Sequence, residues 1–180
     1  MQQISTENTK EIITYGLHDT PLGQIVIAQS CKGLCWLGFM VSKEEGAYKG
    51  DGFARMEEYF PNSELARDDA RTIDLMNDIM QAWDQDTLKS LDLDLRGTDF
   101  QCSVWKALLD IPRGQVISYG DVANDIGKPK ASRAVGSAVG KNPVSLIVPC
   151  HRVVQAGGDL GNYGWGVKLK KKILHFEGVD

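Results

Sequence analysis

The sequence predicts an α+β protein, with a small antiparallel sheet in its first half and a group of helices in its second. Segments 11–17, 22–29 and 34–41 are apolar, β-prone and separated by turn residues. The second half instead repeats its apolar residues at helical spacing. At 180 residues, 42% hydrophobic and 24% charged, the chain has the composition of a globular protein with one large or two small domains.

The remaining elements of the first half follow from local patterns. A short helix is expected over 52–60, where it is stopped by a proline, and a longer one over 70–83. The alternating LDLDL at 91–95 predicts one more half-buried strand. The pattern then changes, so we place the domain boundary between 1–94 and 95–180.

The second half carries two helix-start signals. Thr98 and Gln101 have the spacing of a capping box before the first helix, and Ser118 can cap a second helix over 119–126. A short glycine turn then leads to a third helix over about 130–140. Helix, tight turn and helix together are typical of a helix-turn-helix, although helix pairs joined in this way also occur in bundles.

The third helix has very few bulky side chains. Ala131, Ser132 and Gly136 belong to this thin surface, and each internal glycine costs about 1 kcal/mol relative to alanine. Two interpretations explain why the protein would keep a thin helix at that cost. Either the helix packs closely against another helix, or it enters a narrow nucleic-acid groove with Arg133 as its long cation.

Charge is distributed unevenly along the chain. Residues 1–94 contain 8 Lys and Arg against 17 Asp and Glu, a net −9, whereas residues 95–180 contain 12 against 7, a net +5. The overall charge of −4 would argue against nucleic acid as a partner. The basic second half makes such a partner plausible again.

Three of the four cysteines suggest packing. Cys31 and Cys35 have no second ligand pair at zinc-finger spacing, and although His18 could join them, their surroundings indicate a buried strand. Cys102 falls in a helical pattern. We therefore expect no metal site. With neither a secretory signal nor a membrane-spanning run in the sequence, we expect a cytoplasmic protein that does not bind membranes.

Cys150 lies in a different setting. An apolar run ends in Pro149, and Cys150, His151 and Arg152 follow directly. A neighbouring imidazole or cation can lower the pKa of a thiol and make it nucleophilic. Adjacent strand residues point to opposite faces, so cooperation between this cysteine and histidine requires a bend or a bridging water. A buried cysteine beside a satisfied histidine is the alternative interpretation.

The string Asn142-Pro143-x5-Pro149-Cys150-His151-Arg152-Val153 resembles the active-site signature of the O6-alkylguanine-DNA alkyltransferases, which repair DNA by direct reversal. Further blocks resemble the family in the same order, strongly over about 98–178 and weakly over 1–94. They are Phe100-Gln101-x2-Val104-Trp105, Ile117-Ser118-Tyr119, Ser132-Arg133-Ala134-Val135-Gly136, Gly161-Asn162-Tyr163 and Leu174-x2-Glu177-Gly178.

The resemblance implies a ribonuclease-H-like α/β domain over 1–94 and a helix-turn-helix domain of winged-helix type over 95–180 that carries the active site. It also implies a monomer that binds double-stranded DNA containing O6-alkylguanine. The lesion base, or an O4-alkylthymine, would be flipped from the minor groove. Its alkyl group would pass irreversibly to Cys150 in a single turnover without a cofactor.

The resemblance also implies catalytic roles. Cys150 would be the nucleophile and His151 the general base acting through water, with Glu177 stabilising the imidazolium. Tyr119 would donate a hydrogen bond or proton to the guanine, and Asn142 would order the active-site turn. Without the resemblance, Tyr119 would be a core residue at a helix start.

For DNA, the resemblance implies that Arg133 fills the gap left by the flipped base, with Ala131, Ser132, Gly136 and Tyr119 beside it. The implied substrate pocket contains Val153, Tyr163, Gly164, Trp165 and Lys170. The lysine run around Lys170 otherwise suggests a solvated helix face, and Arg152 suggests a brace for the turn. Trp165 is larger than the small residues of many members, which predicts a tight pocket that prefers methyl to benzyl groups.

Three other functions would use parts of this pattern. A non-catalytic lesion binder would lack Cys150. A transcription regulator of this type would need a cluster of zinc-binding cysteines that 180 residues do not provide. A cysteine hydrolase would have no use for a DNA-binding helix. We therefore expect alkyl transfer.

Overall fold

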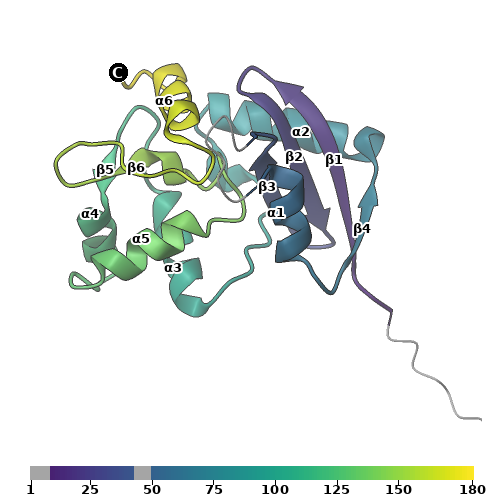
Figure 1. The fold of residues 1–180 in the computed structure, drawn as a ribbon, viewed down its shortest axis with the longest axis horizontal. Helices are drawn as coiled ribbons and strands as arrows, with labels where there is room; N and C mark the ends of the chain where they lie inside the picture. Colours follow the sequence, from purple (N-terminus) through teal and green to yellow (C-terminus); the bar gives the residue numbers. More distant parts are fainter. Residues whose placement is uncertain (1–8, 43–49) are drawn as a thin grey trace, which may run out of the picture.

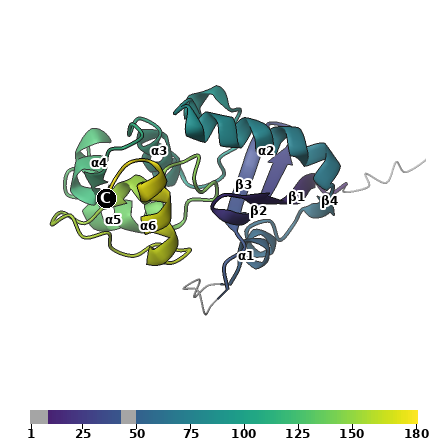
Figure 2. The ribbon, with the colours of Figure 1, turned by 90° about the horizontal axis from the view of Figure 1, so that it is seen from above.

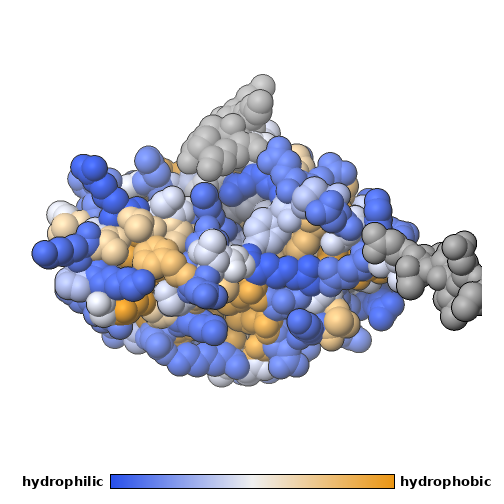
Figure 3. Space-filling view, turned by 90° about the horizontal axis from the view of Figure 1, so that it is seen from below, coloured by the Kyte–Doolittle hydropathy of each residue, from blue (hydrophilic) through white to orange (hydrophobic). Residues whose placement is uncertain are grey.

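The computed structural model describes residues 9–42 and 50–180, which form two parts lying side by side (Figure 1). A sheet with two helices makes up the first half, and shorter helices make up the second. The coarse α+β prediction is confirmed. No helix among the described residues is long and apolar enough to cross a membrane. On the face seen in Figure 3, hydrophobic residues lie in separate patches bounded by hydrophilic side chains.

The sheet has four strands in the order β3-β2-β1-β4. Strands β1 (Ile12–Thr20), β2 (Gly23–Ser30) and β3 (Gly33–Phe39) form the expected antiparallel meander. Strand β4 (Glu64–Arg67) was not expected and pairs with β1 in parallel. The sheet is therefore mixed, and the antiparallel prediction was wrong in this respect. Four residues with no buried side chain give β4 too weak a pattern to recognise.

Helices cover both faces of this sheet. Figure 2 shows α2 (Asp69–Asp84) on one face and α1 (Gly52–Tyr59) on the other. Asp51 and Asp68 cap them by accepting hydrogen bonds from the backbone of the first turn. Because both faces are covered, β2 is buried continuously at its centre rather than in alternate positions.

The strand predicted over 91–95 is reduced to one bridge between Leu34 and Leu93, after the short 3₁₀ helix η2 (Leu88–Ser90). Two later segments of the chain share the outer edge of β3. Leu34 bonds to the backbone of Asp92 and Asp94, while Leu37 bonds to the segment around Val144. Neither segment runs along β3 far enough to form a strand. Through this edge the first half connects directly to the turn that precedes Cys150.

The predicted capping box at Thr98 and the predicted cap at Ser118 are both present, and Ser118 also forms a capping box. Thr98 pairs with Gln101 at the start of α3, and Ser118 pairs with Asp121 at the start of α4. A two-stranded parallel sheet joins β5 to β6. The elements are α3 (Asp99–Leu108), β5 (Ile117–Ser118), α4 (Tyr119–Asp125), α5 (Ser132–Gly140), η3 (Cys150–Arg152), β6 (Val153–Val154) and α6 (Val167–Phe176).

The thin helix α5 begins at Ser132, two residues later than expected, and has two different faces. Val135, Ala138 and Val139 are buried, and the carbonyl of Ala138 accepts a hydrogen bond from the Trp105 indole at 2.8 Å. Arg133 is exposed on the other side. Close packing therefore explains the small residues on one face, and the opposite face is free to meet a ligand.

Candidate active site

The turn before Cys150 is held by one side chain. The Asn142 amide nitrogen donates to the Val148 carbonyl at 2.7 Å, and the amide oxygen accepts from the Val144 N–H at 3.0 Å. Leu146 within this turn has φ of +70°, a strained value for a branched side chain. The two Asn142 hydrogen bonds, together with the backbone bonds to Leu37, hold this turn in place, and the ordering role of Asn142 stays a prediction.

Residues Cys150–Arg152 form the 3₁₀ helix η3, which supplies the bend that cooperation between neighbouring side chains requires. All three residues are buried. Burial raises the pKa of the Cys150 thiol, while the Asn142 amide, the Lys170 charge and the Tyr163 hydroxyl act in the opposite sense. The resting thiol therefore keeps its proton and needs a base.

Glu177, the C-cap of α6, is the centre of a buried polar network. Its Oε1 lies 2.8 Å from His151 Nε2 and accepts from Arg152 Nη2 at 2.9 Å, and its Oε2 accepts from Arg152 Nε at 3.0 Å. Burial favours the neutral acid, but the hydrogen bonds from His151 and Arg152 outweigh it and lower the pKa of Glu177 to about 2. The carboxylate is therefore ionised.

His151 is arranged to act as a base. Burial lowers its pKa, against the opposing effect of Glu177, so the ring is neutral near pH 7. With the Nε2 proton directed at Glu177, Nδ1 is left as the acceptor, and it has no hydrogen-bond partner among the described residues. A buried unsatisfied acceptor of this kind is suited to taking a proton from a water or a thiol.

The end of α2 joins this network from the first half. Trp83 Nε1 donates to Glu177 Oε1 at 2.9 Å, and Asp86 accepts from Arg152 Nη1 at 3.2 Å. Arg152 also donates to the Ile111 carbonyl at 2.6 Å. The geometry fits the brace expected of Arg152. Sequence reasoning missed Trp83 and Asp86, because contacts of this kind carry no local pattern.

A pocket of about 360 Å³ opens beside Cys150, within the size range of small-molecule sites. It is lined from both halves of the chain. Tyr119 is half-buried there, and burial together with the nearby Cys150 raises its pKa, so that it remains a proton donor. The predicted residues that the structure brings together in this lining are Tyr119, Gly136, Asn142, Cys150, Tyr163, Gly164 and Trp165.

Trp165 and Tyr163 form the buried wall of this pocket. The Trp165 indole donates to Ser145 Oγ at 2.8 Å and meets Phe39 edge to face. The Tyr163 hydroxyl is buried beside the Cys150 thiol, and burial, together with Cys150, holds its pKa well above the ordinary value.

The match to known proteins covers most of the chain. Residues 99–179 match the family model of the 6-O-methylguanine DNA methyltransferase, DNA binding domain. Over 166 residues the chain is 40% identical to a methylated-DNA–protein-cysteine methyltransferase of Methanosarcina acetivorans, covering 91% of this chain and 97% of that relative. The chain belongs to this methyltransferase family.

Two other relatives of the methyltransferase show how far the similarity extends. The chain is 38% identical over 166 residues to the bifunctional transcriptional activator and DNA repair enzyme Ada of Escherichia coli, covering 92% of this chain and 45% of Ada. A structure of Mycobacterium tuberculosis OGT in complex with DNA is similar with a TM-score of 0.71 at 36% identity, covering 91% of this chain and 92% of that one.

Some predicted site residues of the methyltransferase lie outside the pocket lining. The prediction of a solvated face was wrong for Lys170, which is buried and donates to the carbonyls of Val153 at 2.7 Å and Leu160 at 2.6 Å. The other lysines of the run are exposed. Burial lowers the pKa of Lys170 to about 8, against the charge of Cys150. Ser132 and Arg133 begin α5, and Ala131 is its N-cap.

Of the cysteines expected to pack, Cys35 and Cys102 do so, whereas Cys31 is exposed in the turn between β2 and β3. Cys35 is buried and donates weakly to the Ala28 carbonyl, and burial raises its pKa to about 12. His18 contacts the Thr72 hydroxyl at 2.8 Å. Cys102 is half-buried against the backbone of Leu95. Within residues 9–42 and 50–180, no group of three His, Cys, Asp or Glu side chains could hold a metal ion.

Proposed function

We propose that this chain repairs alkylated double-stranded DNA by moving an alkyl group from guanine O6, or from thymine O4, to Cys150. The observation that carries this proposal is the position of Cys150 beside a base-sized pocket, backed by a buried His151–Glu177 pair. The name of the Methanosarcina relative, which describes methyl transfer from DNA to a protein cysteine, supports the same reaction, and the Mycobacterium tuberculosis OGT structure in complex with DNA supports DNA as the partner.

The chemistry is a single displacement. His151 takes the thiol proton through a water, and Glu177 stabilises the imidazolium that forms. The Cys150 sulfur then bonds to the alkyl carbon as the carbon–oxygen bond breaks, leaving its electron pair on the guanine. Tyr119 donates a hydrogen bond or proton to the ring as this negative charge develops.

The product of that displacement is a thioether, which has no easy route back to a thiol. Each molecule of the protein would therefore act once and would need no cofactor. One chain contains the whole constellation, so the proposed active form is a monomer. Its proposed place of action is the cytoplasm, with the DNA.

DNA binding is assigned to the exposed face of α5. We propose that α4, the Gly127 turn (φ +73°) and α5 form a helix-turn-helix whose second helix enters the minor groove. Ala131, Ser132 and Gly136 allow close approach, and Arg133 fills the gap left by the flipped base. Flipping costs a few kcal/mol, and least for a poorly paired lesion.

The domain boundary at 94/95 also becomes a proposal. The mixed sheet with helices on both faces supports a ribonuclease-H-like domain over 1–94. The capped helices and the small β5-β6 sheet support a domain of winged-helix type over 95–180 that carries the active site. We further propose that Trp165, fixed by Ser145 and Phe39, limits the pocket to small alkyl groups.

Intact mass spectrometry tests the reaction. Incubation with a short duplex containing O6-methylguanine should add one methylene, about 14 Da, to the protein, with the gain mapped to Cys150. Cys150→Ser should show no gain, while the exposed Cys31→Ser should keep it. Tight lesion binding without any mass gain would instead identify a damage sensor. The absence of both lesion binding and mass gain would refute the proposal.

A further inference from the structure

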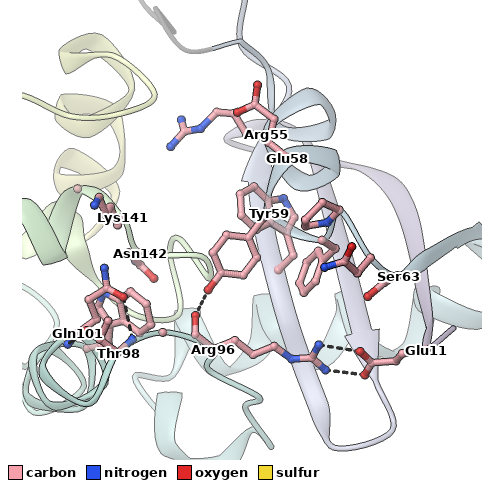
Figure 4. A pocket seen from close by; sticks show the side chains of 17 residues that line it. Glu11, Arg55, Glu58, Tyr59, Ser63, Arg96, Thr98, Gln101, Lys141 and Asn142 are labelled. Atoms are coloured by element: carbon pink, nitrogen blue, oxygen red, sulfur yellow. Dashed lines mark hydrogen bonds and ion pairs between the residues drawn. The ribbon is translucent and has the colours of Figure 1, made fainter.

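A second and larger cavity lies next to the alkyl pocket. It measures about 850 Å³ and separates α1 from α3 and the start of the active-site turn (Figure 4). Its lining includes the aromatic residues Trp36, Tyr59, Phe60 and Trp105. The two cavities share only three lining residues among those described, namely Arg55, Gly140 and Asn142.

Arg55 is the long side chain of this shared wall. It projects from α1 in the first half and donates from Nη1 to the Gly164 carbonyl at 3.1 Å. Its guanidinium carbon lies 3.8 Å from the centre of the Trp165 ring, at stacking distance. Figure 4 shows the side chain reaching from α1 towards the second half of the chain.

The fit between Arg55 and the 163–166 segment is close. A Cβ placed on Gly164 would lie 3.3 Å from Arg55 Nη2 and 3.4 Å from Nη1, closer than ordinary contact. Glycine at 164 therefore lets the guanidinium approach this segment closely. The other two shared residues offer no comparable barrier, because Gly140 has no side chain and Asn142 is tied within its own turn.

We infer that Arg55 is a specificity-determining residue: it closes the alkyl pocket towards the interdomain cleft and holds Trp165 in place as one wall. This inference rests on the proposed alkyl transfer. A methyl group fits on the Cys150 side of the wall. A bulky arylmethyl group needs the space that Arg55 fills, so Arg55 makes the protein select against such lesions.

The cleft beyond the wall would suit an aryl group. Some of its polar groups are already paired with one another: the Tyr59 hydroxyl donates to the Arg96 carbonyl, and Arg96 forms a two-bond ion pair with Glu11 (Figure 4). The rest of the lining combines the four aromatic side chains with polar residues such as Glu58 and Lys141. Truncating Arg55 would connect this surface to the alkyl pocket, and aromatic rings favour edge or offset contacts with one another.

The experiment compares two substrates in each variant. Single-turnover rates are measured with matched duplexes carrying O6-methylguanine or O6-benzylguanine. Arg55→Ala should raise the benzyl-to-methyl rate ratio by about tenfold or more, the scale on which a pocket discriminates by substituent size. The ratio is insensitive to any loss of folded protein, since both rates scale with the same active fraction.

Matched variants distinguish the loss of the Arg55–Trp165 wall from an effect of removing any arginine. Arg71→Ala removes an exposed arginine from α2 and should leave the ratio unchanged. Trp165→Gly should also raise the ratio, and the double variant should gain less than the two separate effects combined, because the two side chains form one wall.

Each possible outcome is decisive. An unchanged ratio in Arg55→Ala, or strictly independent effects of Arg55 and Trp165, would overturn the inference while the proposed function stands. A parent protein that transfers neither methyl nor benzyl would overturn the proposed function and the inference with it.

Discussion

The Glu177 carboxylate organises the buried polar network beside Cys150. Its Oε1 receives hydrogen bonds from Trp83 and Arg152 and lies beside His151, all within 2.9 Å. Buried charges are tolerated only when they are paired and hydrogen-bonded in this way. The same interactions that keep Glu177 ionised also fix the His151 tautomer, so the structural role of this side chain and its proposed catalytic role depend on the same contacts.

Acid should therefore destabilise the protein in a predictable window. The pKa of Glu177 is lowered from 4.5 to about 2, so its contribution is complete above 4.5 and lost as the pH falls towards 2. His151, buried and neutral, has a pKa below its ordinary 6.5, so its contribution also fades as the pH falls below 6.5. Urea unfolding between pH 7 and pH 3 should show a steady loss of unfolding free energy.

Replacing the carboxylate tests this account. Glu177→Gln leaves Arg152 as an incompletely paired buried cation, which should cost about 3 kcal/mol at pH 7 and flatten the acid dependence. It should also slow alkyl transfer, because the imidazolium loses its counter-charge. Glu57→Gln on the exposed side of α1 is the control. Parental stability and rate in Glu177→Gln would contradict the role assigned to the network.

At the scale of elements, helix α2 links the two halves of the molecule. Its packing against β1 forms the first-half core, and its end directs Trp83 and Asp86 at the active-site network. Arg113 closes the connection by donating to the Trp83 and Phe176 carbonyls. A helix of the sheet domain thus positions groups that act in the other half.

Trp83→Phe tests this link. It keeps the ring but removes the N–H that reaches Glu177, so we expect a loss of about 1–2 kcal/mol of unfolding free energy. The transfer rate should fall several-fold, with a shifted pH profile. Trp36→Phe removes a comparable indole hydrogen bond, to the Gly52 carbonyl, away from Glu177. If the two variants react at the same rate, the positioning role of Trp83 is wrong.

On the scale of the whole molecule, the charge difference between the halves should determine which side of the protein faces DNA. The first half carries −9 and the second +5, and the exposed face of α5 lies in the basic half. Proteins that contact phosphates release counterions on binding, so their affinity falls with salt. We expect DNA to approach the second half only, with the acidic half turned away.

Salt titrations measure this orientation. Anisotropy with a labelled duplex should show affinity falling steadily as salt rises from about 50 to about 200 mM. Arg133→Ala should weaken binding and, if the arginine contacts phosphate, reduce the slope by about one. The same substitution at Arg71 in the acidic half should change neither quantity. Arg71 is a sufficient control for Arg133, since both are exposed arginines that differ chiefly in location.

Short-range chemistry could be predicted from the sequence. The capping box at Thr98, the helix cap at Ser118 and the three meander strands were predicted because their signals lie within a few residues. The segment around Cys150 was found because its pattern is dense and continuous. The prediction failed at 91–95 and at β4, where pairing with a distant strand edge decides whether a segment is a strand.

The sequence by itself determined the proposed nucleophile with its histidine neighbour, the thin helix and the capped helices, since each depends on residues close together in the chain. Only the tertiary structure decided that Lys170 is buried, that Trp83 reaches Glu177 and that Arg55 stacks on Trp165. Arg55 and Gly164 are 109 positions apart. Contacts over such distances arise from packing, which brings side chains together without leaving any periodicity or spacing in the sequence.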